Sequence, residues 1–295
     1  MHEHVKHLYE NRKVLKSALL AVFSFMFVEF LIGWFFNSLA LLADAAHMFA
    51  DSAALIIAFF AAWIAGKRAP PEKTFGYLRA ETLAGLANCT ILATVAYEII
   101  HNAIIKLMQP AVSIISLPII LAAAIGLIIN LVVVRKLHGS EEIYMKAAFY
   151  EVIFDTAGSV IVLCSAVIMQ FTKIYYFDAL AALILGILVV PRLVGLFKSL
   201  INTILEVVPD HINFTNLIND MLKVRNVKEV HDVHVWEVAT GFTTLSAHVV
   251  AQKESSLHEI EEMLHKKYHI WHATLQFEPK PAKEVYVHGR WIKKA

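Results

Sequence analysis

The sequence predicts an α-helical membrane protein with six transmembrane helices and a C-terminal cytoplasmic α+β domain. Hydrophobic residues make up 58% of its 295 residues and charged residues only 17%, whereas soluble domains are nearer 25% charged. Mean hydropathy is +0.60. From about Val207 onward, short alternating and amphipathic patterns replace the long apolar runs. Length and composition therefore indicate a membrane domain over 17–206 and a small α+β domain over 207–282.

Six apolar segments are each long enough to cross a bilayer. They are 17–36, 39–65, 81–107, 113–134, 144–170 and 177–201. Lys and Arg concentrate before the first segment and in the second and fourth connections, so the positive-inside rule predicts that both termini are cytoplasmic. The polar start argues against a cleavable signal peptide.

The two chain ends carry weaker signals. The tail over 1–16 contains His2, His4 and His7, which fit either a flexible tail or a weak metal-collecting segment. The tail over 283–295 is basic at its end and receives no assignment. Cys89 and Cys164 lie in apolar runs without a CxxC partner, so a disulfide framework is not expected.

The soluble domain reads as helix, strand, strand, helix and strand. The expected elements are a helix at Ile212–Arg225, strands at Val230–Val238 and Thr243–Ala251, a helix at Ser255–Tyr268 and a strand at Ala273–Phe277. Ser255 or Ser256 is the expected N-cap of the second helix, with Glu259 in its first turn. This order predicts a two-layer sandwich with both helices on one face of the sheet.

Two i,i+4 pairs of ionisable residues lie inside apolar segments. His47 and Asp51 share one face of the second segment, and Glu151 and Asp155 share one face of the fifth. A carboxylate at this depth costs roughly 2.5–3.5 kcal/mol on insertion scales, so a compensating cation is expected. Four such residues match the coordination number of zinc. The alternative is that each pair makes hydrogen bonds between helices.

Other intramembrane polar residues surround this candidate site. Asp44 lies one turn before His47 and fits a ligand, an access-path group or a helix-end partner. We expect three further polar residues to lie beside the site or on the path to it: Glu81, Asn88 and Asn130. A structural role in helix packing fits them as well.

Several separate strings resemble the cation diffusion facilitator family. They are ADAAHMFADS at 43–52, FGYLRAETLAGLAN at 75–88, EVIFDTAGSV at 151–160 and VHDVHVWEVATGFTTLSAHVV at 230–250. The chain is most similar to the bacterial cobalt–zinc–cadmium resistance branch of these metal/proton antiporters. The resemblance implies a homodimer in the bacterial inner membrane, with a ferredoxin-like, metallochaperone-like cytoplasmic domain. It implies efflux of divalent metal against protons by alternating access. It implies no enzyme activity, no cofactor beyond transported or regulatory metal, and no nucleic-acid partner.

By motif position, the resemblance assigns the transport site to His47, Asp51, Glu151 and Asp155. The family normally has His where this chain has Glu151, so one imidazole and three carboxylates replace two of each. Zinc is the expected ion. Cadmium, cobalt, iron(II) and manganese remain open, because carboxylates favour harder ions and imidazole favours zinc.

The resemblance also implies a regulatory metal site in the soluble domain. It carries over to His234, His248 and Glu278, and less directly to His231 with His265 or His269. Strand alternation is expected to put His231 and His234 on opposite faces.

A charge interlock at the dimer centre carries over to Arg79, with Asp210 as its partner. A positive-inside membrane anchor is the alternative for Arg79.

Other functional classes fit less well. A membrane metalloenzyme needs an open metal position with a catalytic base, typically HExxH, and the six segments contain no such motif. A metal-sensing membrane protein, or a metal channel without proton coupling, remains the alternative function.

Overall fold

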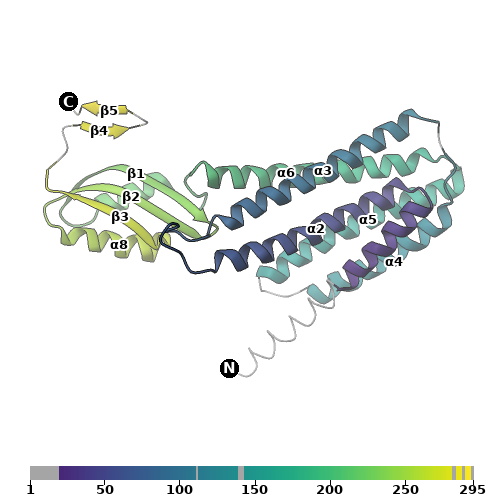
Figure 1. Ribbon diagram of the computed structural model, residues 1–295, viewed down its shortest axis with the longest axis horizontal. Helices are drawn as coiled ribbons and strands as arrows, with labels where there is room; N and C mark the ends of the chain where they lie inside the picture. Colours follow the sequence, from purple (N-terminus) through teal and green to yellow (C-terminus); the bar gives the residue numbers. More distant parts are fainter. Residues whose placement is uncertain (1–19, 111, 139–142, 281–283, 288–289, 294–295) are drawn as a thin grey trace, which may run out of the picture. The chain divides into compact units, whose positions relative to one another are not determined.

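The computed structural model describes residues 20–110, 112–138, 143–280, 284–287 and 290–293 (Figure 1). The chain divides into two compact units. The first comprises residues up to Ile57 together with Ala87–Leu196, and the second comprises Ala58–Leu86 together with Phe197–Ala295.

The predicted transmembrane helices are confirmed in the described residues. A first apolar helix covers Leu20–Phe35, and residues 17–19 of its predicted span lie outside the described part. Five further helices are long and apolar enough to cross a membrane. They are α2 (Leu39–Ala65), α3 (Ala80–Met108), α4 (Ser116–Leu137), α5 (Ile143–Thr172) and α6 (Tyr176–Ile204). Hydropathy predicted these spans to within three residues at each end.

The interior of the first unit is lined mainly by small and aliphatic side chains. One core cluster joins residues of α2, α4, α5 and α6, including Leu41, Ile119, Val162 and Met169, which are 0% exposed. Many large apolar side chains, such as Phe154 and Phe171, are exposed instead. This inside-out distribution suits a bundle surrounded by lipid, because helices satisfy their own backbone hydrogen bonds there.

Asp178 at the start of α6 caps the N-terminus of α2. Its carboxylate accepts hydrogen bonds from the Leu39 amide at 2.7 Å and from the Ser38 hydroxyl at 2.6 Å. Lys106 of α3 donates to the same carboxylate at 2.8 Å. The first amides of a helix lack intrahelical partners, so a fully buried carboxylate there satisfies them and joins three helices.

The soluble part of the second unit has the predicted order of elements. It contains α7 (Phe214–Leu222), β1 (Val227–Ala239), β2 (Phe242–Ala251), α8 (Ser255–Tyr268) and β3 (His272–Glu278). The sheet order is β1-β2-β3, with β1 and β2 antiparallel and β2 and β3 parallel. Leu217 of α7 and Leu264 of α8 pack with Leu245 and Val249 of β2 in one core. The predicted two-layer arrangement is therefore confirmed.

Two local features of the second unit differ from prediction. The N-cap of α8 is Glu254, not Ser255 or Ser256, and it makes no side-chain cap. Ser256 instead donates a hydrogen bond from its Oγ to the Arg225 carbonyl at 2.7 Å, which ties α8 to the chain preceding β1. Because α8 begins after Glu254, Glu259 lies beyond its first turn. The C-terminal tail contains a hairpin of β4 (Glu284–Val287) and β5 (Arg290–Lys293).

A β-bulge changes the faces of β1. His231 pairs with His248, but His234 pairs with Ser246, so three steps on β1 match two on β2. Asp232 within this bulge has a φ of 50°. Paired residues share a face of the sheet. His231 and His234 therefore lie on the same face, and the expectation of opposite faces is wrong.

Candidate metal-binding sites

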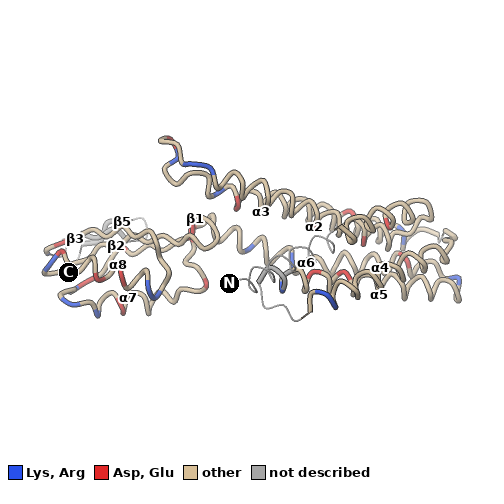
Figure 2. The backbone as a smooth tube through the Cα atoms, turned by 90° about the horizontal axis from the view of Figure 1, so that it is seen from below, with Lys and Arg blue, Asp and Glu red and all other residues tan. Residues whose placement is uncertain are grey.

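Helices α2 and α5 bring three of the four predicted transport residues together. His47, Asp51 and Asp155 each offer a ligand atom, and these atoms all lie within 4.8 Å of one another. The His47 Nε2 and Asp51 Oδ2 atoms are 3.4 Å apart, as the i,i+4 spacing predicts. Asp155 is 5% exposed. Acidic residues that interrupt otherwise uncharged helices of the bundle are visible in Figure 2.

These three side chains are incompletely satisfied. Among the described residues, His47 Nδ1, Asp51 Oδ2 and Asp155 Oδ1 are buried atoms without a hydrogen-bond partner. Each buried polar atom left unpaired costs about 1–3 kcal/mol, and more if charged. Two carboxylates and one imidazole converging on one point form a donor set that suits a divalent cation. The group fits a metal better than it fits helix–helix hydrogen bonding.

The fourth predicted residue, Glu151, is engaged elsewhere. Arg192 of α6 donates two hydrogen bonds to it, from Nη1 to Oε1 and from Nη2 to Oε2, both at 2.7 Å. Glu151 also lies within hydrogen-bonding reach of Asp51 and electrostatically close to His47, but it is not part of the three-residue group. Arg192 was not among the predicted site residues, although an arginine within an apolar span is itself a signal of a functional site.

The predicted neighbours divide into buried and exposed residues. Asp44 is 3% exposed, and a Cβ placed on Gly158 of α5 would lie 2.8 Å from its Oδ1. Asn130 of α4 donates a hydrogen bond to Ser159 of α5 at 3.2 Å. Asn88 is half-buried with an unpartnered Oδ1. Glu81 belongs to the second unit and is exposed.

Glu29 of the first helix is a buried carboxylate that the sequence analysis missed. It is 1% exposed, and its Oε2 is unpartnered among the described residues. A Cβ on Gly126 of α4 would lie 2.9 Å from its Oε1, so the glycine provides the space that the carboxylate occupies. The single acidic residue in an otherwise apolar helix was the available signal.

A cavity of about 140 Å³ adjoins His47 of the three-residue group. Its polar lining comes from Asp44, His47 and Arg192, and the rest is largely apolar, with Phe154 and Leu188 among the lining residues. A small cavity with a few convergent polar groups is typical of a site for a small ligand.

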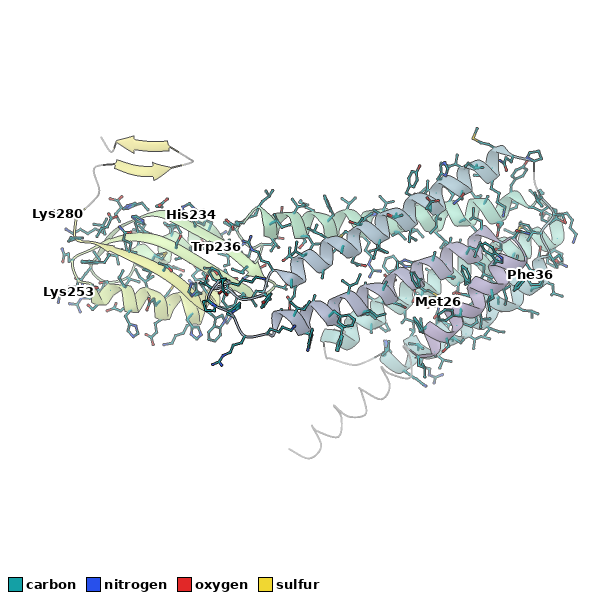
Figure 3. The ribbon with its side chains drawn as sticks, viewed as in Figure 1. Met26, Phe36, His234, Trp236, Lys253 and Lys280 are labelled. Atoms are coloured by element: carbon teal, nitrogen blue, oxygen red, sulfur yellow. The ribbon has the colours of Figure 1, made fainter. Side chains whose placement is uncertain are left out.

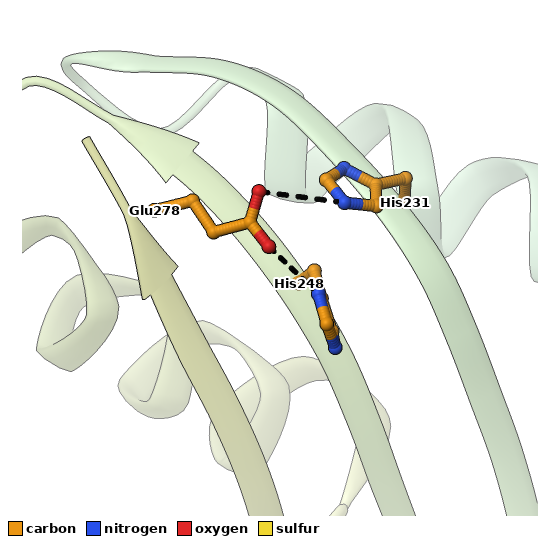
Figure 4. A group of neighbouring side chains, drawn as sticks. All are labelled: His231, His248 and Glu278. Carbon is orange, nitrogen blue, oxygen red and sulfur yellow. Dashed lines mark hydrogen bonds and ion pairs between the residues drawn. The ribbon is translucent and has the colours of Figure 1, made fainter. Parts of the chain in front are cut away.

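A second group of possible ligands lies on the soluble domain's sheet (Figure 4). Glu278 Oε1 lies 2.8 Å from His248 Nδ1, and Glu278 Oε2 lies 3.6 Å from His231 Nε2. Ligand atoms from all three residues lie within 4.8 Å of one another. Leu245 and Val249 of β2 face the helices, so alternation puts His248 on the opposite face. Two imidazoles and a carboxylate are suitable zinc ligands.

Asp232 is a further neighbour that sequence reasoning missed. Its Oδ1 lies 3.0 Å from His234 Nε2, and its Oδ2 lies 3.8 Å from His248 Nε2. The side chain of His234, labelled in Figure 3, is 60% exposed. His234 pairs with Ser246, which is two residues before His248 on β2. The bulge brings His234 to the correct face without bringing it into the three-residue group.

The remaining predicted residues of the second unit lie outside this group. The His265 ring stacks edge-on against Trp271, with ring centroids 3.8 Å apart. His269 is the C-cap of α8, with a φ of 54°. Arg79 Nη2 pairs with Glu206 Oε1 at 2.7 Å, whereas the predicted partner Asp210 is exposed. His2, His4 and His7 lie outside the described residues.

The comparisons with known protein families agree with this architecture. Residues 15–205 match the cation efflux transmembrane domain, and residues 209–280 match the cation efflux protein cytoplasmic domain. The chain belongs to the cation efflux family. The resemblance drawn from the sequence motifs is thereby confirmed, as is the order of a membrane domain followed by a cytoplasmic domain.

Curated relatives of this cation efflux protein span most of its length. The cation efflux system protein CzcD of Alcaligenes sp. strain CT14 is 38% identical over 282 residues, covering 93% of this chain and 89% of the relative. The cadmium, cobalt and zinc/H(+)-K(+) antiporter of Bacillus subtilis is 32% identical, covering 91% and 89%. The zinc transporter ZitB of Pectobacterium atrosepticum is 36% identical, covering 91% and 86%.

A solved structure of a metal-bound C-terminal domain also matches. It comes from the CzcD transporter of Cupriavidus metallidurans and is 32% identical, covering 23% of this chain and 99% of that chain, with a TM-score of 0.22.

Proposed function

We propose that this cation efflux protein exports a divalent transition metal from the cytoplasm in exchange for protons. The observation that carries the proposal is the group of His47, Asp51 and Asp155, which offers ligand atoms within 4.8 Å of one another. Each of the three residues also has a buried polar atom without a hydrogen-bond partner among the described residues. The relatives' names, which include zinc transporters and a cadmium, cobalt and zinc antiporter, support this class of cargo. They also favour transport over catalysis as the activity.

Exchange follows from the chemistry of the ligands. A metal ion and a proton compete for the same lone pairs on imidazole and carboxylate groups, so metal binding releases protons and proton binding releases metal. Cytoplasmic metal reaches the group between α2 and α5 and displaces protons. The bundle then opens outward, and protons returning down their gradient reload the site. Alternating access is thus the mechanism that couples the two fluxes.

Zinc is the proposed cargo. One imidazole and two carboxylates are common zinc ligands, and a water completes four-coordination. The same oxygen-rich set also accepts cadmium, cobalt, iron(II) or manganese, since carboxylates suit harder ions. Selectivity among these ions therefore depends on how many carboxylates engage the metal.

The cytoplasmic domain is proposed to regulate transport as part of a homodimer. The group of His231, His248 and Glu278 supplies two imidazoles and a carboxylate for a regulatory metal. Binding shifts the conformational balance if one state of the transporter holds this metal more tightly. His234 joins the site only if metal binding draws it toward His248, and His265 and His269 lie outside it. The proposed orientation in the bacterial inner membrane has both termini in the cytoplasm.

Reconstitution into proteoliposomes tests the transport site. Asp51→Ala removes one of the three converging ligands, so metal-driven proton flux should be abolished. Glu72→Ala, which alters an exposed carboxylate in the connection between α2 and α3, is the matched control and should retain flux. Unchanged flux in Asp51→Ala would overturn the site. Metal flux without any pH change in the unaltered protein would instead indicate a channel.

A further inference from the structure

The ion pair between Arg192 and Glu151 is a feature of the membrane domain that the proposed function leaves unexplained. Arg192 lies in the apolar helix α6, directly after Pro191. Its guanidinium makes a two-point ion pair with Glu151 of α5, with both N–O distances at 2.7 Å. The guanidinium fork matches carboxylate geometry, and such bidentate pairs are among the strongest side-chain hydrogen bonds. This pair occupies the position at which the family motif predicts a fourth metal ligand.

We infer that Arg192 is a specificity-determining residue that keeps Glu151 out of the metal's ligand set. This inference rests on the proposed function and specifies its transport site. The cation is held by His47, Asp51 and Asp155, while Glu151 and Arg192 remain paired with each other. The site thus keeps one imidazole and two carboxylates as ligands although the sequence offers three carboxylates.

Charge balance supports this division of roles. Asp51, Asp155 and Glu151 together carry three negative charges when ionised, and Arg192 contributes one positive charge. With the buried carboxyls of Asp44 and Glu29 counted as neutral acids, these four residues sum to −2, which a dication neutralises. Without Arg192 the sum would be −3, and a bound dication would leave an uncompensated charge inside the membrane, which is costly.

The geometry of the ligand atoms supports the same division. Arg192 and His47 both line the cavity of about 140 Å³. The three ligand atoms of the group converge without Glu151. Arg192 therefore contacts both the cavity and Glu151.

A double-mutant cycle on the full-length protein tests the assignment. Glu151→Gln leaves Arg192 as an unpaired cation beside the site, so the apparent affinity for Zn²⁺ in proteoliposome uptake should fall about tenfold or more. Arg192→Met frees Glu151 to bind the metal, which should raise uptake of Mn²⁺ relative to Zn²⁺. The double variant has a neutral pair and three intact ligands, so its Zn²⁺ affinity should return to within about threefold of the unaltered protein.

The double variant decides between the two roles of Glu151. If Glu151 were a ligand, the double variant would remain as weak as Glu151→Gln, and the inference would be overturned. Arg192→Lys keeps the charge without the two-point geometry, so it should retain the Zn²⁺ preference with a smaller loss of affinity. A shift of Arg192→Lys toward Mn²⁺ equal to that of Arg192→Met would also count against the inference. Thermal unfolding of each purified variant verifies that it is folded.

Asp51→Ala measured in parallel separates this inference from the proposed function. Normal Zn²⁺ uptake by Asp51→Ala would overturn the assignment of the transport site itself, whatever the double-mutant cycle on Glu151 and Arg192 shows. Lost uptake by Asp51→Ala, together with an unrescued double variant, would leave the site in place and refute only the role of Arg192.

Discussion

Lys106 Nζ lies 2.8 Å from Asp178 Oδ2, although the two residues are 72 positions apart in the chain. The same lysine donates to the Asn37 carbonyl at 2.7 Å. Asp178 is 0% exposed and also accepts from the Ser38 hydroxyl and the Leu39 amide. Three helices therefore depend on one buried carboxylate at this end of the first unit.

Asp178→Ala should strongly destabilise the protein. The substitution removes the cap of α2 and the partner of Lys106, and loss of one member of a buried ion pair costs about 3–5 kcal/mol. The SDS concentration that half-unfolds the purified protein should fall accordingly. Glu259→Gln, at an exposed position of α8, is the control and should leave the midpoint in place. Equal midpoints for both variants would show that Asp178 contributes no stability.

Gly158→Ala should disturb Asp44. The added Cβ would lie 2.8 Å from Asp44 Oδ1, and overpacking of this kind costs about 1–3 kcal/mol. Metal transport should slow in proteoliposomes, because Asp44 lines the cavity beside His47.

Two further variants make the Gly158 result specific. Gly195→Ala in α6 adds a methyl group with nothing within 4 Å, so it should transport normally. Asp44→Ala combined with Gly158→Ala should be no worse than Asp44→Ala alone, since the clash is then absent. An additive loss in the double variant would place the defect elsewhere.

His248→Ala should weaken zinc binding by the cytoplasmic domain. Calorimetry on the full-length protein in an Asp51→Ala background isolates this site. Loss of one supporting residue at a metal site already costs about 10–100-fold in affinity, so loss of a ligand should cost at least as much. His258→Ala, whose side chain is 85% exposed, is the control.

His234→Ala distinguishes the two possible ligand sets of the cytoplasmic site. The structure groups His231 with His248 and Glu278, so His234→Ala should bind zinc nearly as well as the unaltered protein. A loss equal to that of His248→Ala would favour the set that the family resemblance implied.

Asp220 should give the soluble domain an acid-sensitive contribution to stability. Its carboxylate accepts hydrogen bonds from Lys267, from the Tyr268 hydroxyl at 2.7 Å and from Lys223 at 3.0 Å. The pKa of Asp220 is held well below its usual range by these bonds, the one from Lys267 first. A lowered folded-state pKa stabilises above about pH 4, and this stabilisation is lost as the pH falls toward the folded-state value.

Hydrogen exchange of α7 and α8 in the full-length protein measures this contribution. Asp220→Asn should exchange faster than the unaltered protein at pH 7. The ratio of the two rates should begin to fall below about pH 4 and approach one only as the pH nears the folded-state pKa. Asp210→Asn, at an exposed position, should exchange like the unaltered protein throughout. A ratio independent of pH would exclude titration of Asp220.

Burial and then the bond to Asp220 raise the pKa of Tyr268 to about 12. The contribution of Tyr268 to stability is therefore lost only as the pH rises from about 10 toward that value.

The membrane helices could be predicted from the sequence because lipid imposes a simple constraint. Every spanning segment needs about 20 apolar residues and satisfied backbone hydrogen bonds. The predicted span 39–65 equals α2, and 144–170 differs from α5 by one residue at its start and two at its end. The face shared by His47 and Asp51 follows from helix geometry alone in the same way.

Partners between elements could not be predicted from spacing. Glu151 and Asp155 have the same i,i+4 spacing as His47 and Asp51, yet only Asp155 joins the group. The difference arises because α6 places Arg192 within reach of Glu151, and this depends on packing between helices. Similarly, the extra residue in the β1 bulge reverses the faces that simple alternation predicts for His234.

The hydrogen bonds of Asp178 fix the N-terminal end of α2, so a tilt of this helix would move its distant residues most. At a rise of 1.5 Å per residue, His47 lies about 12 Å and Asp51 about 18 Å from Leu39. A tilt of about 10° around that end would carry the two ligands about 2 and 3 Å along their arcs. Metal–ligand distances tolerate only about 0.2 Å. A rotation of this size around the Leu39 end would therefore be large enough to bind or release an ion.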